Sequence, residues 1–319
     1  MIERPDPDVR GDDVRIRVAL GGLCGTDLSI FAGDIPVAYP RVLGHEMCGT
    51  VFAGDAVPAG TRVVVDPSIS CGACYQCTRG QSNVCPTGAL LGRDRDGILA
   101  ESISVPARNV YVLPDAVGDD VGPLIQVLTT CVHAHRQTEI FPGDVVVVIG
   151  LGVTGLIHVQ LARSRGAALV VGVSRSRAKL ELARELGADE VLEADGDVAA
   201  DVARASDGRG ADVVIESAGK VATFAQAIEL ARIGGAVMAY GTMTETDGRL
   251  PFYDLYHKEL RISNPRAAKP EDFPVAIAMV AAGRIRLAPL VTDRFPLSDL
   301  PAAFQAASSG RSLKVLVEV

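Results

Sequence analysis

The chain has 319 residues, of which 48% are hydrophobic and 22% charged, and its formal net charge at pH 7 is −8. This length suits about two domains, and the composition is that of a globular protein with a substantial core. The negative charge argues against non-specific binding to nucleic acids or anionic membranes, and apolar runs such as 145–152 are too short to span a bilayer. Residues 1–10 show no basic and apolar leader, so we expect a cytoplasmic protein.

The first part of the chain is predicted to consist of short β-strands. Between residues 12 and 115, valine-rich runs alternate with glycine and proline, as at Val14–Val18, Thr61–Val65 and Ile98–Val105. Runs of this kind are typical of an antiparallel barrel or sandwich.

From residue 144 the pattern becomes one of alternating strands and helices. Val145–Ile149 is a continuous β-branched run, which indicates a strand buried on both faces, and Gly152–Arg165 has helical periodicity. The elements expected next are strand Leu169–Val173, helix Arg177–Leu186, strand Val213–Glu216, helix Val221–Arg232 and strand Ala236–Gly241. The alternation predicts a doubly wound parallel sheet, in which the strand at 236–241 is the last strand and forms the edge.

After about residue 263 this alternation stops. The remaining segments predict a helix at Pro270–Ala282, an extended stretch at Leu287–Phe295, a short helix at Leu300–Ser308 and a strand at Leu313–Val319.

A glycine-rich turn joins the first buried strand of the second region to its helix. Gly150, Gly152 and Gly155 form a Gly-x-Gly-x-x-Gly pattern with Leu151, Val153 and Thr154 between them. The first glycine would allow a tight turn, the second a close approach to a pyrophosphate, and the third close packing of helix and strand. A purely structural turn is the alternative, but the strand–helix–strand order favours a dinucleotide site.

The second strand of this region ends without the acidic residue that usually binds the ribose hydroxyls of NAD. The chain has Ser174 and Arg175 there, with Lys179 shortly after. A hydroxyl and a guanidinium would bind a 2′-phosphate, so we predict NADP in preference to NAD. The alternative is that these are solvated basic residues at the start of a helix.

Four of the seven cysteines lie within fifteen residues, namely Cys71, Cys74, Cys77 and Cys85. Four thiolates at this spacing in a reducing compartment suit a closed, structural zinc site, and an iron–sulfur cluster is the alternative. Cys48 and Cys131 are expected to be buried thiols of the core.

Two short stretches could supply a second zinc site. Cys-Gly-Thr-Asp at 24–27 and Gly-His-Glu at 44–46 each carry a zinc-binding residue type. Together with the four-cysteine segment, the glycine-rich turn and Glu-Ser-Ala-Gly at 216–219, they resemble the zinc-dependent medium-chain alcohol and polyol dehydrogenase family. The resemblance covers nearly the whole chain.

The resemblance implies an α/β fold with two domains. A GroES-like β-barrel catalytic domain would occupy residues 1–135, including a zinc lobe at 71–85, and would be completed by residues 266–319. A Rossmann NAD(P)-binding domain with a doubly wound parallel sheet would occupy residues 136–265. The resemblance also implies a homodimer or homotetramer with two zinc ions per chain, one catalytic and one structural.

The resemblance further assigns roles to residues of the catalytic zinc site. Cys24 and His45 would be ligands, Glu46 a ligand or close neighbour that exchanges with substrate or water, and Thr26 the hydroxyl that passes the substrate proton. Gln126 stands where polyol dehydrogenases usually carry a glutamate ligand, and Ser29 where many members carry a relay histidine.

The implied function is hydride transfer between NADP(H) and a secondary alcohol or ketone, specifically a polyol, sugar or cyclitol. The departures at Gln126 and Ser29 leave one alternative, a non-catalytic NAD(P)-binding member with a degraded catalytic zinc site. The presence of Cys24, Thr26, His45 and Glu46 favours the enzyme.

Overall fold

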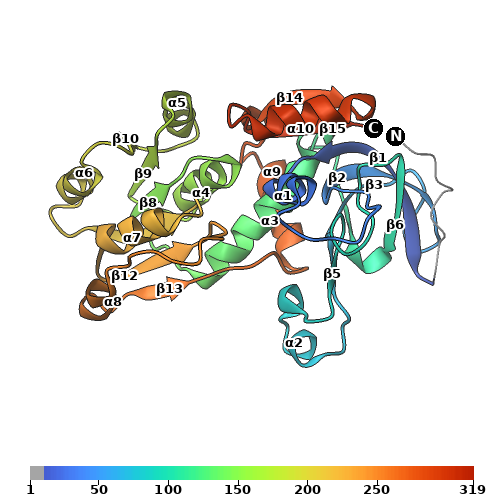
Figure 1. The fold of residues 1–319 in the computed structure, drawn as a ribbon. Coiled ribbons are helices and arrows are strands. Elements are labelled where there is room, and N and C mark those ends of the chain that lie inside the picture. The colour runs from blue at the N-terminus through green and yellow to red at the C-terminus, as the bar shows by residue number, and fades with distance from the viewer. Residues whose placement is uncertain (1–10) are drawn as a thin grey trace. The chain divides into compact units, whose positions relative to one another are not determined.

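The computed structural model describes residues 11–319, so the expectation about residues 1–10 lies outside the described part. The chain divides into two compact units (Figure 1). Unit 1 comprises residues up to Thr129, Ala267–Gly283 and Leu287–Val319, and unit 2 comprises Thr130–Arg266 and Arg284–Arg286. No helix in the described part of the chain is long and apolar enough to cross a membrane.

Unit 1 is built on a seven-stranded sheet with the order β14-β15-β1-β2-β3-β7, in which β6 also pairs with β1. The strands are β1 (Asp13–Gly22), β2 (Glu46–Ala53), β3 (Arg62–Val65), β6 (Ser102–Pro106), β7 (Val110–Val112), β14 (Val291–Pro296) and β15 (Lys314–Glu318). Alternate residues of β1, such as Val14, Ile16 and Val18, point into the core. The C-terminal β15 lies antiparallel beside β1, so the end of the chain completes the sheet begun at its start (Figure 1).

Helices and a small lobe accompany this sheet. The helices are α1 (Gly25–Ala32), α9 (Asp272–Ala281) and α10 (Leu300–Ser308). The lobe contains a two-stranded sheet and a one-turn helix, formed by β4 (Ser68–Ile69), β5 (Ala89–Leu90) and α2 (Tyr75–Thr78).

The strand expected at Ile98–Val105 is wrong in its first half, because β6 begins only at Ser102. Ile98 and Leu99 are buried, and their amides donate to the carbonyls of Gly44 and Leu43 in an irregular segment. Their apolar side chains therefore pack into the core, although the backbone there does not belong to a strand.

Unit 2 contains a six-stranded parallel sheet with the order β10-β9-β8-β11-β12-β13. The strands are β8 (Val145–Ile149), β9 (Leu169–Ser174), β10 (Glu190–Glu193), β11 (Ala211–Glu216), β12 (Ala231–Ala239) and β13 (Arg261–Ser263). The order reverses at β8, which is the arrangement of a doubly wound sheet. The helices of this region are α3 (Gly122–Gln137), which contains the boundary between the units, α4 (Val153–Ser164), α5 (Arg177–Glu185), α6 (Val198–Ala205), α7 (Val221–Leu230) and α8 (Phe252–His257).

The prediction that Ala236–Gly241 is the edge of this sheet is wrong, because β13 pairs with β12 and forms the edge. β12 also begins at Ala231, five residues earlier than expected. β13 has only three residues, too few for a periodic pattern to show.

A lysine from later in the chain lies at the end of α7. The side-chain amine of Lys258 donates to the carbonyls of Ile228, Glu229 and Ala231 at 3.0, 2.7 and 3.0 Å. These bonds satisfy carbonyls that the end of a helix leaves without partners. The helix ends at Leu230, two residues before the predicted end, because the backbone is extended from Ala231, where β12 begins.

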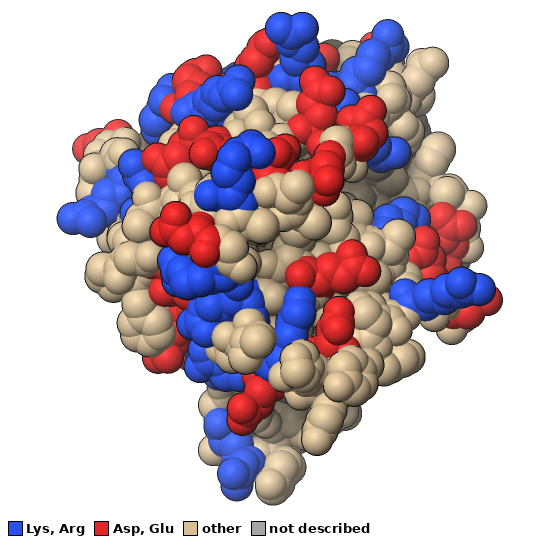
Figure 2. All heavy atoms as spheres, turned by 90° about the vertical axis from the view of Figure 1, so that its left-hand side faces the viewer, with Lys and Arg blue, Asp and Glu red and all other residues tan. Residues whose placement is uncertain are grey.

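Acidic and basic side chains are intermixed on the face seen in Figure 2. Interspersed charges of opposite sign produce a weaker long-range potential than a patch of one sign.

Candidate zinc centres and nucleotide-binding loop

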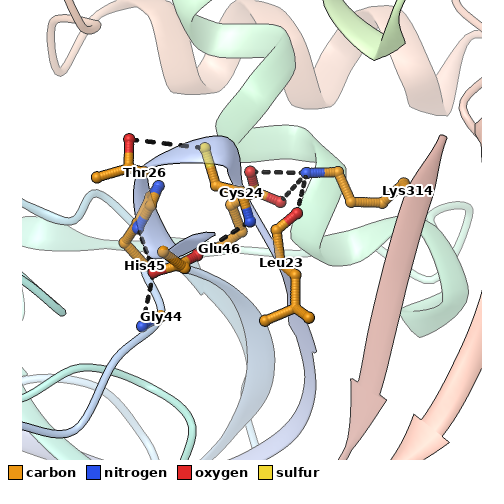
Figure 3. Close-up of polar contacts among 8 residues, drawn as sticks. Leu23, Cys24, Thr26, Gly44, His45, Glu46 and Lys314 are labelled. Carbon is orange, nitrogen blue, oxygen red and sulfur yellow. Dashed lines mark hydrogen bonds and ion pairs between the residues drawn. The ribbon is translucent and has the colours of Figure 1, made fainter. Parts of the chain in front are cut away.

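The end of β1 and the start of β2 bring Cys24, His45 and Glu46 together. Gly22 is paired with Glu46 in the β1–β2 register, and Cys24 follows at the N-terminus of α1. The thiol, one imidazole nitrogen and one carboxylate oxygen lie within 4.8 Å of one another (Figure 3). Sulfur, imidazole and carboxylate are the ligand types that zinc takes in proteins, so this donor set fits a zinc ion.

Asp27 orients two of these residues. Its carboxylate is fully buried and accepts hydrogen bonds from the amides of Cys24 at 2.9 Å and Gly44 at 3.0 Å. Nδ1 of His45 lies 3.4 Å from the same carboxylate, which leaves Nε2 for a metal (Figure 3). Asp27 is the last residue of the Cys-Gly-Thr-Asp stretch, and its role could not be predicted from the sequence.

The protonation state of His45 is coupled to the same neighbours. Burial lowers the pKa of His45, but the charge of Cys24 and the hydrogen bond to Asp27 outweigh this effect, and the pKa is raised well above its ordinary value. Because zinc binds a neutral imidazole and a thiolate, metal binding would release protons from this cluster.

Lys314 of β15 holds Glu46 from the other side. Its buried ammonium lies 2.8 and 2.6 Å from the two carboxylate oxygens of Glu46 and donates to the carbonyl of Leu23 at 2.9 Å (Figure 3). Burial lowers the pKa of Lys314, but the charges of Glu46 and Cys24 outweigh it, so the pKa is raised. Sequence reasoning missed Lys314 because it lies 268 positions from Glu46.

The other residues predicted for this centre occupy two helices. Thr26 lies in the first turn of α1, with its hydroxyl 3.9 Å from the Cys24 sulfur (Figure 3). Ser29 lies one turn later in α1, and its carbonyl accepts hydrogen bonds from the amides of Asp34 and Ile35. Gln126 is half-buried in α3, and its role as a ligand stays a prediction.

The four cysteines of the lobe converge on one point. The sulfur atoms are 3.6 Å apart for Cys71–Cys85, 3.8 Å for Cys74–Cys85 and 4.0 Å for Cys71–Cys77. A tetrahedral zinc ion with Zn–S bonds of about 2.3 Å requires sulfur atoms roughly 3.8 Å apart. Backbone amides also donate to two of the sulfurs, and such bonds help to lower the pKa of Cys71 to about 6. The arrangement fits a closed four-sulfur zinc site.

The glycine-rich turn of unit 2 runs from the end of β8 into α4. Gly150 has a positive φ of 90°, which favours glycine, and a Cβ on Gly155 would overlap the carbonyl oxygen of Gly150. A Cβ on Gly152 would meet no atom within 4 Å, so this side of the turn is open. The hydroxyl of Thr154 lies 2.8 Å from that of Ser217 in the loop after β11. Leu151 is buried and Val153 half-buried beside them.

The residues predicted to select NADP lie at the end of β9. Ser174 is its last residue and accepts a hydrogen bond from the amide of Ser176 at 3.2 Å. Arg175 is exposed and Lys179 half-buried. Glu193 of β10 is the register partner of Ser174 and is exposed, which adds a carboxylate that the sequence analysis did not consider.

A buried histidine pair connects α3 and α4. Nε2 of His135 lies 3.1 Å from Nδ1 of His158, and the ring of His158 packs edge-on against Tyr240. The outer ring nitrogens have no hydrogen-bond partner among the described residues. Cys48 and Cys131 are fully buried, as predicted.

Comparisons with known proteins identify the family of this chain. Residues 10–115 match the model of the alcohol dehydrogenase GroES-like domain, and residues 153–282 match that of the zinc-binding dehydrogenases. A sorbitol dehydrogenase from Halalkalibacterium halodurans is 33% identical over 99% of this chain and 94% of its own length. The chain belongs to the zinc-dependent medium-chain alcohol and polyol dehydrogenase family.

Two further members of this dehydrogenase family are similar to the chain over most of its length. A D-arabitol-phosphate dehydrogenase from Enterococcus avium is 30% identical over 98% of the chain and 91% of its own length. The structure of a zinc-binding dehydrogenase from Sinorhizobium meliloti bound to NADP has a TM-score of 0.93 and 33% identity, covering 98% of this chain and 94% of that one. The predicted family and fold class are therefore confirmed, and the protein is a dehydrogenase that uses zinc and a nicotinamide cofactor.

Proposed function

We propose that this dehydrogenase transfers a hydride between NADP(H) and a secondary alcohol or ketone of the polyol, sugar or cyclitol class. The observation that carries the proposal is the cluster of Cys24, His45 and Glu46, which retains both its metal-binding atoms and the groups that orient them. The similarity to a sorbitol dehydrogenase and a D-arabitol-phosphate dehydrogenase supports the polyol class.

We propose a separate role for each residue of the catalytic centre. Cys24 and His45 would hold a zinc ion, which when bound polarises the oxygen of a carbonyl or lowers the pKa of an alcohol. Gln126 is proposed as a third, neutral ligand, which leaves the centre more positive than a glutamate would. Because Lys314 engages both oxygens of Glu46, we propose that it holds this carboxylate back and keeps one position open for the substrate.

Proton transfer is proposed to begin at Thr26. Its hydroxyl lies 3.9 Å from the Cys24 sulfur and can accept the proton of an alcohol substrate. Ser29 replaces the histidine found in many relatives, so the proton would continue through the cofactor ribose and water.

The four-cysteine lobe is proposed to hold the second, structural zinc ion. With four sulfur ligands the site has no open position for a substrate. Its role would be to fix a lobe whose strands, β4 and β5, have only two residues each.

The preference for NADP is supported by Ser174 and Arg175 and by the NADP-bound relative from Sinorhizobium meliloti. The guanidinium of Arg175 would bind the 2′-phosphate, whereas Glu193 on the adjacent strand would oppose it. The preference therefore depends on the balance between these two exposed side chains.

We also propose a homodimer or homotetramer that works in the cytoplasm. β13 leaves one backbone edge of the parallel sheet open, and α8 exposes Phe252, Tyr253 and Tyr256, which are 69, 72 and 83% exposed. Seven free thiols, four of them grouped for metal binding, suit a reducing compartment.

The test combines metal analysis with a substrate screen. Purified protein should contain two zinc ions per chain and should oxidise polyols, sugars or cyclitols faster with NADP than with NAD, and a chelator should abolish turnover. One zinc ion per chain, with NADPH binding but no turnover of any alcohol, would instead support the non-catalytic alternative.

A further inference from the structure

Glu216 is a fully buried carboxylate at the centre of the parallel sheet in unit 2. It is the last residue of β11, and its register partners are Ile149 of β8 and Ala239 of β12. In a doubly wound sheet the dinucleotide lies outside the carboxyl ends of the strands, across the point where the strand order reverses. Glu216 occupies such a carboxyl end, directly beside β8.

The hydrogen bonds of Glu216 favour its charged form, because all three donors point at one carboxylate oxygen. One oxygen, Oε1, accepts from the amides of Ala218 and Gly219, both at 2.8 Å, and from the hydroxyl of Thr223 at 2.7 Å. The other oxygen, Oε2, is buried, and no described residue forms a hydrogen bond with it.

Among the described residues, no cationic side chain pairs with this carboxylate. Within residues 11–319, no Lys, Arg or His forms an ion pair with Glu216; its partners are two amides and one hydroxyl. Dipoles stabilise a buried charge but do not cancel it, so the negative potential of Glu216 extends into its surroundings.

The loops that surround Glu216 are the ones that the cofactor-binding turn contacts. The amide of Ser217 donates to Ile149 at 2.8 Å, and its hydroxyl pairs with Thr154 of the glycine-rich segment. The amide of Gly241, in the loop after β12, donates to the carbonyl of Glu216 at 2.9 Å. The carboxylate thus lies beneath the loops that follow β8, β11 and β12. In this fold, β11 and β12 belong to the second mononucleotide half, opposite the half formed by β8, β9 and β10.

We infer that Glu216 biases this half of the site toward the oxidised cofactor; this inference rests on the NADP binding proposed above. The oxidised nicotinamide ring carries a positive charge and the reduced ring is neutral. When the reduced ring passes a hydride, with both electrons, to the carbonyl carbon, the ring becomes cationic and the carbonyl oxygen takes up a proton. A fixed negative charge stabilises the cationic product, so bound NADPH becomes a better hydride donor.

The experiment compares the affinities of zinc-loaded protein for NADP⁺ and NADPH, measured separately by titration calorimetry. Glu216→Gln removes the charge but keeps the shape and the acceptor at Oε1. Thr223→Lys keeps Glu216 but places an ammonium group beside it, and Thr223→Val removes the same hydroxyl without adding charge. Thr223 is half-buried, and its hydroxyl lies 2.7 Å from Oε1 of Glu216.

We expect the ratio of the dissociation constants, NADP⁺ over NADPH, to rise about tenfold in Glu216→Gln, which is the scale of one unit charge acting across roughly 10 Å of protein. Thr223→Lys should raise the ratio in the same direction, and Thr223→Val should leave it within twofold of wild type. A purely structural role would weaken both affinities together and leave the ratio unchanged.

The outcomes separate the two proposals. If wild type binds neither NADP⁺ nor NADPH, the proposed cofactor is wrong. If wild type binds both, and the ratio stays within twofold of wild type in Glu216→Gln and Thr223→Lys, the inference about Glu216 is overturned. Should Glu216→Gln fail to fold, the ratio in Thr223→Lys, compared with its Thr223→Val control, decides between the same two outcomes.

Discussion

Acid should destabilise unit 2 through the buried pair His135 and His158. Burial lowers the pKa of His158 to about 3 and that of His135 well below its ordinary value, so both rings are neutral in the folded protein. In the unfolded chain each ring takes up a proton with a pKa of about 6.5. The unfolded state therefore binds more protons as the pH falls below 6.5, and the free energy of unfolding decreases. The stability is complete above this pH and is lost as the pH falls toward 3.

The size of the effect follows from proton linkage. Each pH unit below the unfolded pKa lowers the free energy of unfolding by about 1.4 kcal/mol for each histidine that stays neutral in the folded state. Between pH 7.5 and 5.5 the loss is about 1.4 kcal/mol for each ring and about 3 kcal/mol for the pair.

The measurement is urea unfolding at pH 7.5 and 5.5 in buffer that contains zinc. The double variant His135→Leu/His158→Leu should lose about 3 kcal/mol less than wild type over this range. All other titrating groups, including the zinc ligands, are common to both proteins and drop out of the difference. His257→Leu, which removes an exposed histidine of α8, should behave like wild type. Equal losses in wild type and the double variant would refute the assignment of a neutral buried pair.

Three further predictions concern the charges and thiols of the two units. Lys314→Met leaves Glu46 buried without its cation, so the free energy of unfolding, measured by thermal unfolding, should fall by about 3–5 kcal/mol. Adding Glu46→Gln to this variant should restore most of the lost stability. If the double variant is no more stable than Lys314→Met, the pairing of these two residues is contradicted. Cys74→Ser should lower the zinc content measured by elemental analysis by one ion per chain while NADPH binding persists, because the glycine-rich turn lies in the other unit. Arg175→Ala should raise the KM for NADP about tenfold and leave the KM for NAD nearly unchanged. Glu193→Gln should lower the KM for NADP. If either variant changes both KM values equally, a contact with the 2′-phosphate is contradicted.

The fold could be predicted where residues interact with near neighbours. The β-branched run of β8 and the amphipathic pattern of α5 gave their boundaries to within one residue, because burial repeats along a strand or helix. β13 could not be found in this way, since its three residues pair with β12 only when the whole sheet is assembled. The early end of α7 also was not predicted, because β12 begins at Ala231 and pairs with a strand distant in the sequence, β13.

In the candidate site, too, residues in local motifs could be predicted, whereas residues that act through distant contacts could not. The ligand atoms of Cys24 and His45 belong to short local stretches whose residue types point to zinc, and the structure brings these atoms together. Asp27 and Lys314 lack such a signal, because an aspartate and a lysine have many uses in a sequence. Their roles become visible only when β2 and β15 both lie against β1 and bring their side chains to one centre.

The two buried glutamates show why the partner of a charge matters as much as its position. Glu46 and Glu216 are both buried at the end of a strand beside a proposed site. Glu46 is paired with the ammonium of Lys314, so the pair has little net charge and its main effect is to fix where the carboxylate lies. Glu216 is held by amides and a hydroxyl and pairs with no cation among the described residues, so in our proposal its charge would act on whatever binds above it. Substituting Glu46 should therefore change stability and metal geometry, whereas substituting Glu216 should change which charge state of the cofactor is preferred.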